Sequence, residues 1–232
     1  MAKRWFVSGT DTGVGKTYVS CGLLQRLNHL GLSTTALKPV ASGCESSPAG
    51  WRNEDGLALQ AAAAVRLPYE WVNPIALPLA AAPHIAAQQA GQTLNVARLS
   101  EAARPILAEP ADICVIEGAG GWLTPLNEHE TIADWVQSLH AEVILVVGMR
   151  LGCINHALLS YQAIHSSQVN CIAWVANCID PDMPVLAENI ATLAARLPMP
   201  LLAVVPYQGL VATHINSGLL HRLYQAGVAG GE

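Results

Sequence analysis

The sequence has few charged residues and no cluster of basic ones. Asp, Glu, Lys and Arg make up 12% of the chain, the net charge is −5, and no run of Lys or Arg is longer than the pair Lys3-Arg4. Proteins that bind DNA or RNA through bulk electrostatics need clustered positive charge. The 52% of apolar residues also exceeds what disordered chains contain. We therefore expect a folded protein that does not bind nucleic acid.

The sequence also lacks long apolar runs and paired cysteines. No apolar run reaches the ~20 residues that span a bilayer, and the apolar stretch near the N-terminus is too short for a signal peptide. The six cysteines form no C-x-x-C pair, and the eight histidines show no metal-ligand spacing with them. Most of the cysteines lie in apolar surroundings, which favours small buried thiols. These features predict a cytoplasmic protein with no membrane segment.

The most informative segment is Gly-Thr-Asp-Thr-Gly-Val-Gly-Lys-Thr at residues 9–17. It follows the apolar run at 5–7 and precedes an apolar-periodic segment, so it joins a strand to a helix. In that setting backbone N–H groups surround phosphate oxygens, Lys16 adds a positive charge, and the Thr17 hydroxyl can hold Mg²⁺. Five residues separate Gly9 from Gly15, where the usual pattern has four. The segment nevertheless predicts a nucleoside triphosphate site.

Short apolar runs alternate with helix-length segments along the chain, which predicts an α/β fold. The runs at 113–116 and 143–147 are apolar on both faces, as in strands covered by helices on both sides. Alternation of this kind implies right-handed crossovers and a doubly wound, mostly parallel sheet in a three-layer α/β/α arrangement. We expect one domain over 1–232, with 207–232 uncertain and 227–232 frayed. The expected strands are 4–8, 33–38, 112–116, 142–148, 171–176 and 201–205, and the expected helices are 16–30, 54–66 (including Ala61–Ala64), 94–108, 131–139, 154–167 and 184–197.

Polar residues that directly follow these strands should meet at one edge of the sheet, where parallel sheets bind ligands. Glu117 follows a buried strand and suits Mg²⁺, which prefers carboxylate oxygens and substrate phosphates. Asp55 is a second candidate, although it could simply charge a helix N-terminus. Lys38 precedes a small-residue loop and could act with Lys16 on a triphosphate. As a strand-terminal lysine it could equally be a solvated surface charge.

Taken together, these loops resemble the dethiobiotin synthetase family. The resemblance covers residues 1 to about 206, and the five-residue gap in the phosphate loop is the family's own form. The segments that carry it are 9–17, Lys38-Pro39-Val40-Ala41-Ser42-Gly43, Glu117-Gly118-Ala119-Gly120-Gly121, Leu151-Gly152-Cys153-Ile154-Asn155-His156-Ala157 and Trp174-Val175-Ala176-Asn177.

The resemblance implies an ATP-dependent ligase of biotin biosynthesis that uses Mg²⁺. Its substrates would be 7,8-diaminopelargonic acid, CO₂ supplied by bicarbonate, and ATP. An amine of the diamine would form a carbamate, the carbamate would take the γ-phosphoryl group, and the second amine would close the ureido ring. The enzyme would be a homodimer with the active site at the subunit interface.

The resemblance also implies a role for each matching residue. Lys16 and Lys38 would contact the γ-phosphate and the carbamate, Thr17, Asp55 and Glu117 would hold Mg²⁺, and Asn177 would recognise adenine. The implied substrate-binding residues are Thr12, Ser42, Leu151, Gly152, Cys153 and Asn155, the segment from 151 reaching the substrate carboxylate of the neighbouring subunit. The implied ATP-binding residues are Gly13, Val14, Gly15, Lys16, Thr17, Tyr18, Asp55, Glu117, Gly118, Ala119, Gly120, Asn177, Cys178, Pro206, Tyr207 and Gln208.

Two positions depart from the family, and several alternatives stay open. Many members carry Glu at the position of Gly13 and an acid at that of Cys178, so the preference for ATP could be looser here. A partner-regulated switch ATPase of the ParA/MinD kind shares the architecture but has a signature lysine where this chain has Asp11. The related cobyrinate amide synthetases carry an added glutaminase domain, for which 232 residues leave no room. A non-enzymatic nucleotide-binding scaffold also remains open.

Overall fold

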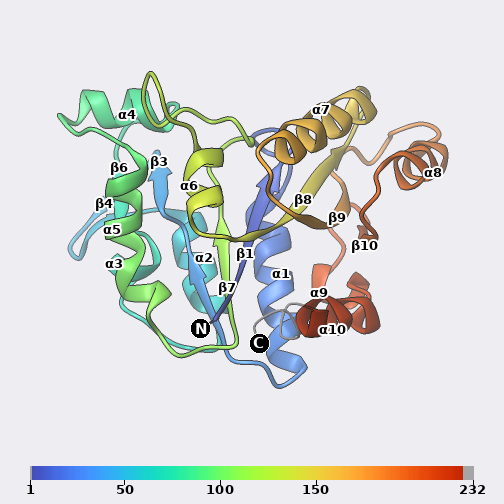
Figure 1. Ribbon diagram of the computed structural model, residues 1–232, viewed down its shortest axis with the longest axis horizontal. Coiled ribbons are helices and arrows are strands. Elements are labelled where there is room, and N and C mark those ends of the chain that lie inside the picture. Colours follow the sequence, from blue (N-terminus) through green and yellow to red (C-terminus); the bar gives the residue numbers. More distant parts are fainter. Residues whose placement is uncertain (1, 227–232) are drawn as a thin grey trace.

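The computed structural model describes residues 2–226, and a six-stranded sheet between helices dominates it (Figure 1). Each strand that the apolar runs predict is present, to within a few residues at its ends. The six strands are β1 Lys3–Gly9, β2 Thr34–Leu37, β7 Ile113–Glu117, β8 Glu142–Met149, β9 Cys171–Cys178 and β10 Leu201–Val205.

All five strand pairs of this sheet are parallel, in the order β10-β9-β8-β1-β7-β2. The chain winds from β1 outward to one edge, returns to β8 beside β1, and then continues to the other edge. Neighbouring strands pair close to their carboxyl ends. Glu117, the last residue of β7, lies opposite Val7 of β1, and Gly9, the last residue of β1, lies opposite Val146 of β8. The loops that follow the strands therefore meet at one edge, as expected for a doubly wound sheet.

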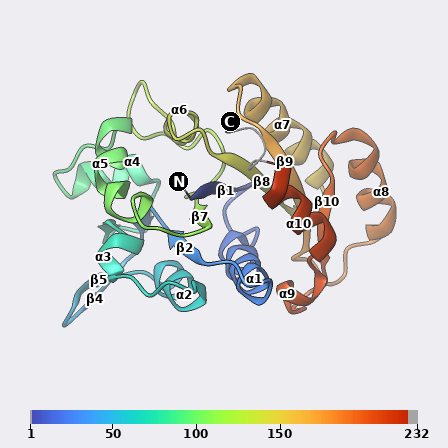
Figure 2. The ribbon, with the colours of Figure 1, turned by 60° about the horizontal axis from the view of Figure 1, so that its bottom comes forward.

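Helices cover both faces of the sheet and make it the middle layer of three. Figure 2 shows α6 and α7 on one side of the strands, with α1 and α2 on the other. Residues 143–147 of β8 are wholly buried, which explains why that run is apolar on both faces. The predicted α/β/α architecture is confirmed. The predicted helices are α1 Lys16–His29, α2 Glu54–Ala62, α5 Val96–Leu107, α6 Ile132–Ser138, α7 Cys153–Ser166 and α8 Leu186–Arg196.

One helix is shorter than its composition suggests. The alanine-rich segment 61–64 predicts a helix to residue 66, but α2 ends at Ala62 and Ala63 is extended. Thr34, at the start of β2, accounts for the difference, because its hydroxyl accepts a hydrogen bond from Ala64 N and its carbonyl one from Val65 N. Alanine favours a helix by less than 1 kcal/mol per residue over most other residues, so these two hydrogen bonds determine where α2 ends.

Several short elements are absent from the sequence prediction. Strands of three residues carry too little periodicity to be recognised. Two of them, β3 and β6, pair in parallel beside the main sheet, and β4 and β5 form a hairpin. The unpredicted elements are β3 Val40–Ser42, β4 Glu45–Ser47, β5 Gly50–Arg52, α3 Tyr69–Val72, β6 Ile75–Leu77, α4 Pro83–Gln89, α9 Val211–His214 and α10 Ser217–Ala226.

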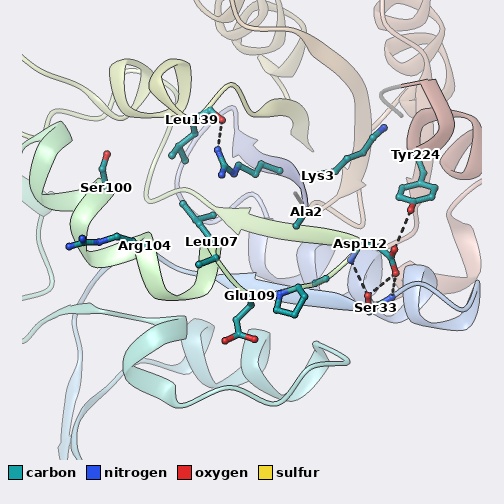
Figure 3. A pocket seen from close by; sticks show the side chains of 14 residues that line it. Ala2, Lys3, Ser33, Ser100, Arg104, Leu107, Glu109, Asp112, Leu139 and Tyr224 are labelled. Carbon is teal, nitrogen blue, oxygen red and sulfur yellow. Dashed lines mark hydrogen bonds between the residues drawn. The ribbon is translucent and has the colours of Figure 1, made fainter. Parts of the chain in front are cut away.

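A polar network lies at the edge of the sheet where strands β1, β2 and β7 begin (Figure 3). A hollow of about 1070 Å³ opens there. The Asp112 carboxylate accepts hydrogen bonds of 2.7 Å from Ser33 N and Ser33 Oγ and of 3.3 Å from the Tyr224 hydroxyl. The bonds from Ser33 hold the pKa of Asp112 below its usual range. Lys3 Nζ donates to the Leu223 carbonyl at 2.9 Å. These contacts attach α10 to the sheet.

Two further expectations from the sequence concern a membrane-spanning segment and the C-terminal part of the chain. Within residues 2–226, no helix has the length and apolar character needed to cross a membrane. The predicted frayed segment 227–232 lies outside the described residues. The uncertain segment from 207 contains α9 and α10 as far as residue 226.

The packing of α9 against α1 predicts a steric effect at Gly22. A Cβ atom there would lie 2.3 Å from Val211 Cβ and 2.5 Å from Val211 Cγ1. We expect Gly22→Ala to lower the free energy of unfolding by about 1–3 kcal/mol, because α9 would have to move away. The measurement is chemical denaturation followed by circular dichroism.

Gly218→Ala is the matched control in α10, since the nearest atom to its added Cβ is 3.6 Å away. Alanine should leave stability unchanged there or raise it by up to ~1 kcal/mol through helix propensity. Equal stability for the two variants would contradict the packing of α9.

Candidate active site

The phosphate loop joins β1 to α1 at the carboxyl edge of the sheet. Gly13 and Gly15 have φ values of 74° and 86°, in the left-handed region that favours glycine. A Cβ on Gly15 would also lie 2.2 Å from Asn177 Nδ2, which donates a hydrogen bond of 2.8 Å to the Val14 carbonyl. Glycine is therefore required at position 15 by both conformation and space. The loop ends at the first turn of α1, whose free N–H groups suit an anion.

A cavity of about 900 Å³ opens beside this loop. Its lining residues come from five segments that follow strands or lead into helices, and they are up to 113 positions apart in the chain, from Thr12 to Pro125. Twelve of the predicted site residues line it: Thr12, Gly13, Gly15, Lys16, Thr17, Tyr18, Lys38, Ser42, Asp55, Glu117, Ala119 and Gly120.

An ion cluster forms the floor of the cavity, with Glu117 and Lys38 buried and the Asp55 side chain 42% exposed. Lys38 Nζ lies 2.6 Å from Glu117 Oε1 and 3.0 Å from Asp55 Oδ2. The Thr17 hydroxyl donates to the same Glu117 Oε1 at 2.8 Å. Glu117 is wholly buried and Lys38 is only 4% exposed, so Lys38 is not a solvated surface charge.

The charges of this cluster support one another. Burial disfavours the Lys38 ammonium, but the negative charges of Glu117 and Asp55 outweigh it and raise the pKa of Lys38. Burial likewise works to raise the pKa of Asp55, and the charge of Lys38 reverses this and lowers it. Lys38 is therefore an ammonium and Asp55 a carboxylate at neutral pH. Asn53, not Asp55, caps α2 by accepting a hydrogen bond from Asp55 N, which leaves the Asp55 side chain to face Lys38.

The same oxygen atoms fit a magnesium ion. Glu117 Oε2 is buried and has no hydrogen-bond partner among the described residues, although a buried carboxylate oxygen ordinarily has one. With the Thr17 hydroxyl and the Asp55 carboxylate it forms a set of hard oxygen donors, which Mg²⁺ prefers. Within the described chain no three His, Cys, Asp or Glu side chains gather into a metal site, so a metal here would rely on two carboxylates, a hydroxyl and its other ligands.

Lys16 also lines the cavity, where it is buried and makes a hydrogen bond to the phosphate loop itself. Its Nζ donates to the Asp11 carbonyl at 2.9 Å. Burial, followed by repulsion from the charge of Lys38, lowers the pKa of Lys16 to about 8. An anion bound in the loop would oppose both effects.

The Asp11 side chain ties the phosphate loop to the end of β8. Its Oδ2 lies 2.6 Å from the Arg150 guanidinium, and its Oδ1 accepts a hydrogen bond of 2.7 Å from Thr12 N. The bond to Thr12 N lowers the pKa of Asp11, with Arg150 adding to the effect against a smaller opposing influence of burial. A residue that would be a lysine in a switch ATPase is thus a carboxylate that helps to shape the loop.

Seven predicted ATP-binding residues lie outside this cavity lining. Val14 and Gly118 are buried beneath it, and Asn177 and Cys178 are buried at the end of β9. The exposed residues Pro206, Tyr207 and Gln208 follow β10. The Tyr18 hydroxyl donates to the Gly209 carbonyl at 2.6 Å, which joins α1 to this last loop. These residues therefore border the other side of the phosphate loop, and their roles stay predictions.

Four predicted substrate-binding residues also lie away from the cavity of their own subunit. Leu151 is 93% exposed, and Gly152, with φ 94°, precedes the first turn of α7. Cys153 is buried, whereas Asn155 is exposed. Their place in the predicted homodimer stays a prediction.

Sequence reasoning missed several residues that line the cavity. They are residues 80–83, which lead into α4, and Asn53, Thr124 and Pro125. It also missed buried Asn73, whose Nδ2 donates to the Lys38 carbonyl at 2.7 Å and so holds the backbone of Lys38. Pro83 at the start of α4 is a helix-start signal that could have drawn attention to this segment. Asn73 has no comparable local signal.

Comparison with known proteins identifies the family. A family model described as an AAA domain matches residues 3–214. A relative from Cellvibrio japonicus, named ATP-dependent dethiobiotin synthetase BioD, is 54% identical over 204 residues, which cover 88% of this chain and 89% of that protein. The chain belongs to the dethiobiotin synthetase family. Relatives of the same name from Pseudomonas aeruginosa and Xylella fastidiosa are 53% and 51% identical, over 87% and 88% of this chain and 89% of each relative.

Solved structures support the fold alone. The crystal structure of cell division protein FtsY from Thermotoga maritima matches with a TM-score of 0.54 and 15% identity, covering 97% of this chain and 68% of that chain. The signal recognition particle receptor FtsY from Elizabethkingia anophelis, in complex with GDP, matches with a TM-score of 0.51 and 14% identity, covering 97% and 63%. With the family model, these matches confirm the predicted P-loop NTPase-like fold.

The lowered pKa of Lys16 predicts that nucleotide binding takes up a proton. Near pH 8 about half of the free protein has neutral Lys16, whereas bound phosphates would hold it as an ammonium. ATP affinity should therefore be constant well below pH 8 and fall as the pH rises above it. Calorimetry in buffers of different ionisation enthalpy measures the uptake, and phosphate oxygens do not contribute because their last pKa is about 6.

Lys16→Met is the control for this titration. It should bind ATP more weakly and take up no proton near pH 8. Proton uptake that persists in the variant, or that is absent from the unaltered protein between pH 8 and 9, would show that Lys16 is not the titrating group.

Proposed function

We propose that this protein is an ATP-dependent dethiobiotin synthetase of biotin biosynthesis. It would convert 7,8-diaminopelargonic acid, CO₂ and ATP into dethiobiotin, ADP and phosphate. The proposal rests on family membership and on one observation in particular: two buried lysines, Lys16 and Lys38, face one cavity beside a phosphate loop. A reaction that moves a phosphoryl group onto a carbamate requires positive charge at both ends of the transfer.

The reaction divides into three steps that balance without a further reactant. A substrate amine bonds through its lone pair to the carbon of CO₂ and loses a proton, which leaves a carbamate. A carbamate oxygen then bonds to the γ-phosphorus of ATP as the bond to ADP breaks. Finally the second amine attacks the activated carbonyl carbon and loses a proton, phosphate leaves, and the ureido ring closes. The protein's main tasks are positioning and charge stabilisation.

The loop residues supply these tasks. The N–H groups after Gly13 and at the start of α1 would bind the phosphates, and Lys16 would neutralise the transferred group. Lys38, at the cavity floor, would stabilise charge on the carbamate and on the γ-phosphate. Thr12 and Ser42 line the same space and offer hydroxyls to the diamine or the carbamate.

Magnesium would be held by Thr17, Asp55 and Glu117, whose oxygen atoms surround the cavity floor. When bound, Mg²⁺ draws phosphate oxygens together and neutralises negative charge that develops during phosphoryl transfer.

The adenine base would bind between β9 and the loop after β10. Asn177 would recognise it, with Cys178 and residues 206–208 beside it. An added Cβ at Gly13 would meet no atom within 4 Å, so the family's carboxylate would have space there, although the φ of 74° favours glycine. Without that carboxylate and without an acid at Cys178, the proposed enzyme should discriminate less strictly among nucleotides.

We further propose a homodimer in which each site is completed by its neighbour. Leu151, in the loop before α7, and Leu159, within α7, are apolar and are 93% and 55% exposed. The free N–H groups at the start of α7 suit the carboxylate of the diamine. Because residues 151–155 do not line the cavity of their own subunit, they would have to reach a partner's cavity to contact substrate. A cytoplasmic location accords with six free cysteine thiols.

A switch ATPase of the ParA/MinD kind is the alternative. Its signature lysine would stand where Asp11 forms an ion pair with Arg150. A carboxylate at that place cannot stabilise a neighbouring subunit's phosphates, so the observation favours the synthetase.

A product assay tests the proposal. Purified protein, the diamine, bicarbonate and MgATP should give dethiobiotin by mass spectrometry together with one ADP for each product molecule. Lys16→Ala should lose about 2 kcal/mol or more of transition-state stabilisation, roughly 30-fold or more in kcat/KM. ATP hydrolysis that proceeds without the diamine and yields no ureido product would instead support the switch ATPase.

Mixing two inactive variants tests the shared site. Lys16→Ala disables the phosphate loop, and Asn155→Asp places a negative charge where the substrate carboxylate would bind. If partner residues complete each site, subunit exchange in an equal mixture should restore about a quarter of wild-type activity, because one site in each mixed dimer has both parts intact. A mixture as inactive as its components would contradict a site built from two subunits.

A further inference from the structure

Lys38 occupies an unusual position for a residue expected to act on substrate. Both of its charged contacts are to the carboxylates that would bind magnesium, at 2.6 Å to Glu117 and 3.0 Å to Asp55. Apart from these, its Nζ has one other acceptor in the described structure, the Gly118 carbonyl at 3.4 Å. In the nucleotide-free protein Lys38 is therefore turned toward the metal ligands.

Burial explains why this contact forms. Glu117 is wholly buried, and a buried carboxylate without a counter-charge costs several kcal/mol. Asp55 stands close enough to the same ammonium to add a second negative charge. One lysine thus neutralises part of a site that carries two negative charges, and Glu117 Oε2 remains without a partner.

We infer that Lys38 is a resident counter-cation of the magnesium site, which a divalent ion displaces and thereby frees to act on the substrate. This inference rests on the proposed function for the identity of the substrate, but its first part concerns the nucleotide-free protein alone. A divalent ion carries twice the charge of an ammonium and approaches oxygens to about 2.0–2.1 Å, so it compensates both carboxylates better. It can also use Glu117 Oε2, which Lys38 leaves unpaired.

Displacement has a direct consequence for Lys38. The ammonium would lose its two carboxylate acceptors while remaining at the floor of the cavity. A buried ammonium needs acceptors, and the oxygens of a phosphate or carbamate in the cavity would provide them. Metal binding and the orientation of Lys38 toward substrate would then be one event. The lysine would point away from the reacting atoms when the metal is absent.

Metal binding to the nucleotide-free protein tests the inference without any activity measurement. Mn²⁺, used as a paramagnetic probe for Mg²⁺, is titrated into the protein and free Mn²⁺ is measured by electron paramagnetic resonance. Lys38→Met keeps the aliphatic part of the side chain but removes its charge. We expect Lys38→Met to bind Mn²⁺ roughly tenfold or more tightly than the unaltered protein, because the competing cation is gone. Equal or weaker binding would overturn the inference.

Three control variants distinguish occupation of the metal site by Lys38 from a general effect of net charge on Mn²⁺ affinity. Lys3→Met removes the same charge at the opposite edge of the sheet and should leave Mn²⁺ affinity unchanged. Lys16→Met removes a charge from the same cavity, but the Lys16 ammonium bonds to the backbone carbonyl of Asp11 rather than to a carboxylate. The increase in Mn²⁺ affinity should therefore be clearly smaller for this variant. The double variant Lys38→Met/Glu117→Gln should not show the increase in Mn²⁺ affinity that Lys38→Met shows. A gain for Lys16→Met as large as that for Lys38→Met would contradict displacement and indicate an effect of net charge.

Lys38→Arg covers the case in which Lys38→Met does not fold because its carboxylates are uncompensated. Arginine keeps the positive charge, so Mn²⁺ should bind Lys38→Arg no more tightly than the unaltered protein, and tighter binding would overturn the inference. Where Lys38→Met does fold, Mg²⁺ should raise its midpoint of thermal unfolding more than that of the unaltered protein. Failure of the proposed function would appear separately, as absence of dethiobiotin in the product assay.

Discussion

The burial of the Glu117 carboxylate is the constraint on which the site depends. Glu117 ends strand β7, between β1 and the edge strand β2, and is wholly enclosed, so its charge persists only with partners drawn from other parts of the chain. Lys38 comes from the loop after β2, and Thr17 comes from the first turn of α1. Through Lys38 the start of α2 is also held, because Asp55 shares the ammonium. One buried negative charge thereby brings three separate segments to the same cavity floor.

The phosphate loop depends on contacts of a different kind. Gly13 and Gly15 have the positive φ values that favour glycine, and the Asn177 side chain from β9 lies where any side chain on Gly15 would be. Tyr18 extends the same loop toward the segment after β10 through the Gly209 carbonyl. Lys16 and Lys38 both line the cavity beside this loop, whereas Asn177 lies outside its lining. Burial, with repulsion from the charge of Lys38 as the second cause, lowers the pKa of Lys16 to about 8. The site is therefore prepared for an anion before one arrives.

Much of the fold follows from local sequence patterns. The parts that do not follow from such patterns have one cause in common. All six strands of the main sheet are visible as apolar runs because helices cover both of their faces. Strands β3 and β6 have three residues each, and nothing but their mutual pairing makes them strands. The end of α2 depends on Thr34, a residue thirty positions from Ala64, and alanine propensity points past it. Asn73 supports Lys38 from a segment that has no recognisable motif. Such contacts are set by distance in space and leave no periodic signal.

By itself the sequence determined that a phosphate loop stands between a strand and a helix, and that polar residues follow strands whose ends meet at one edge. Those features are local, since glycine conformation and apolar periodicity depend on neighbouring residues. Only the tertiary structure decided that Lys38 lies inside the protein rather than in solvent, and that it contacts Glu117 and Asp55. The reason is that a lysine can be buried with its charge only where carboxylates lie within about 3 Å. The carboxylates that contact Lys38 come from residues 17 and 79 positions further along the chain.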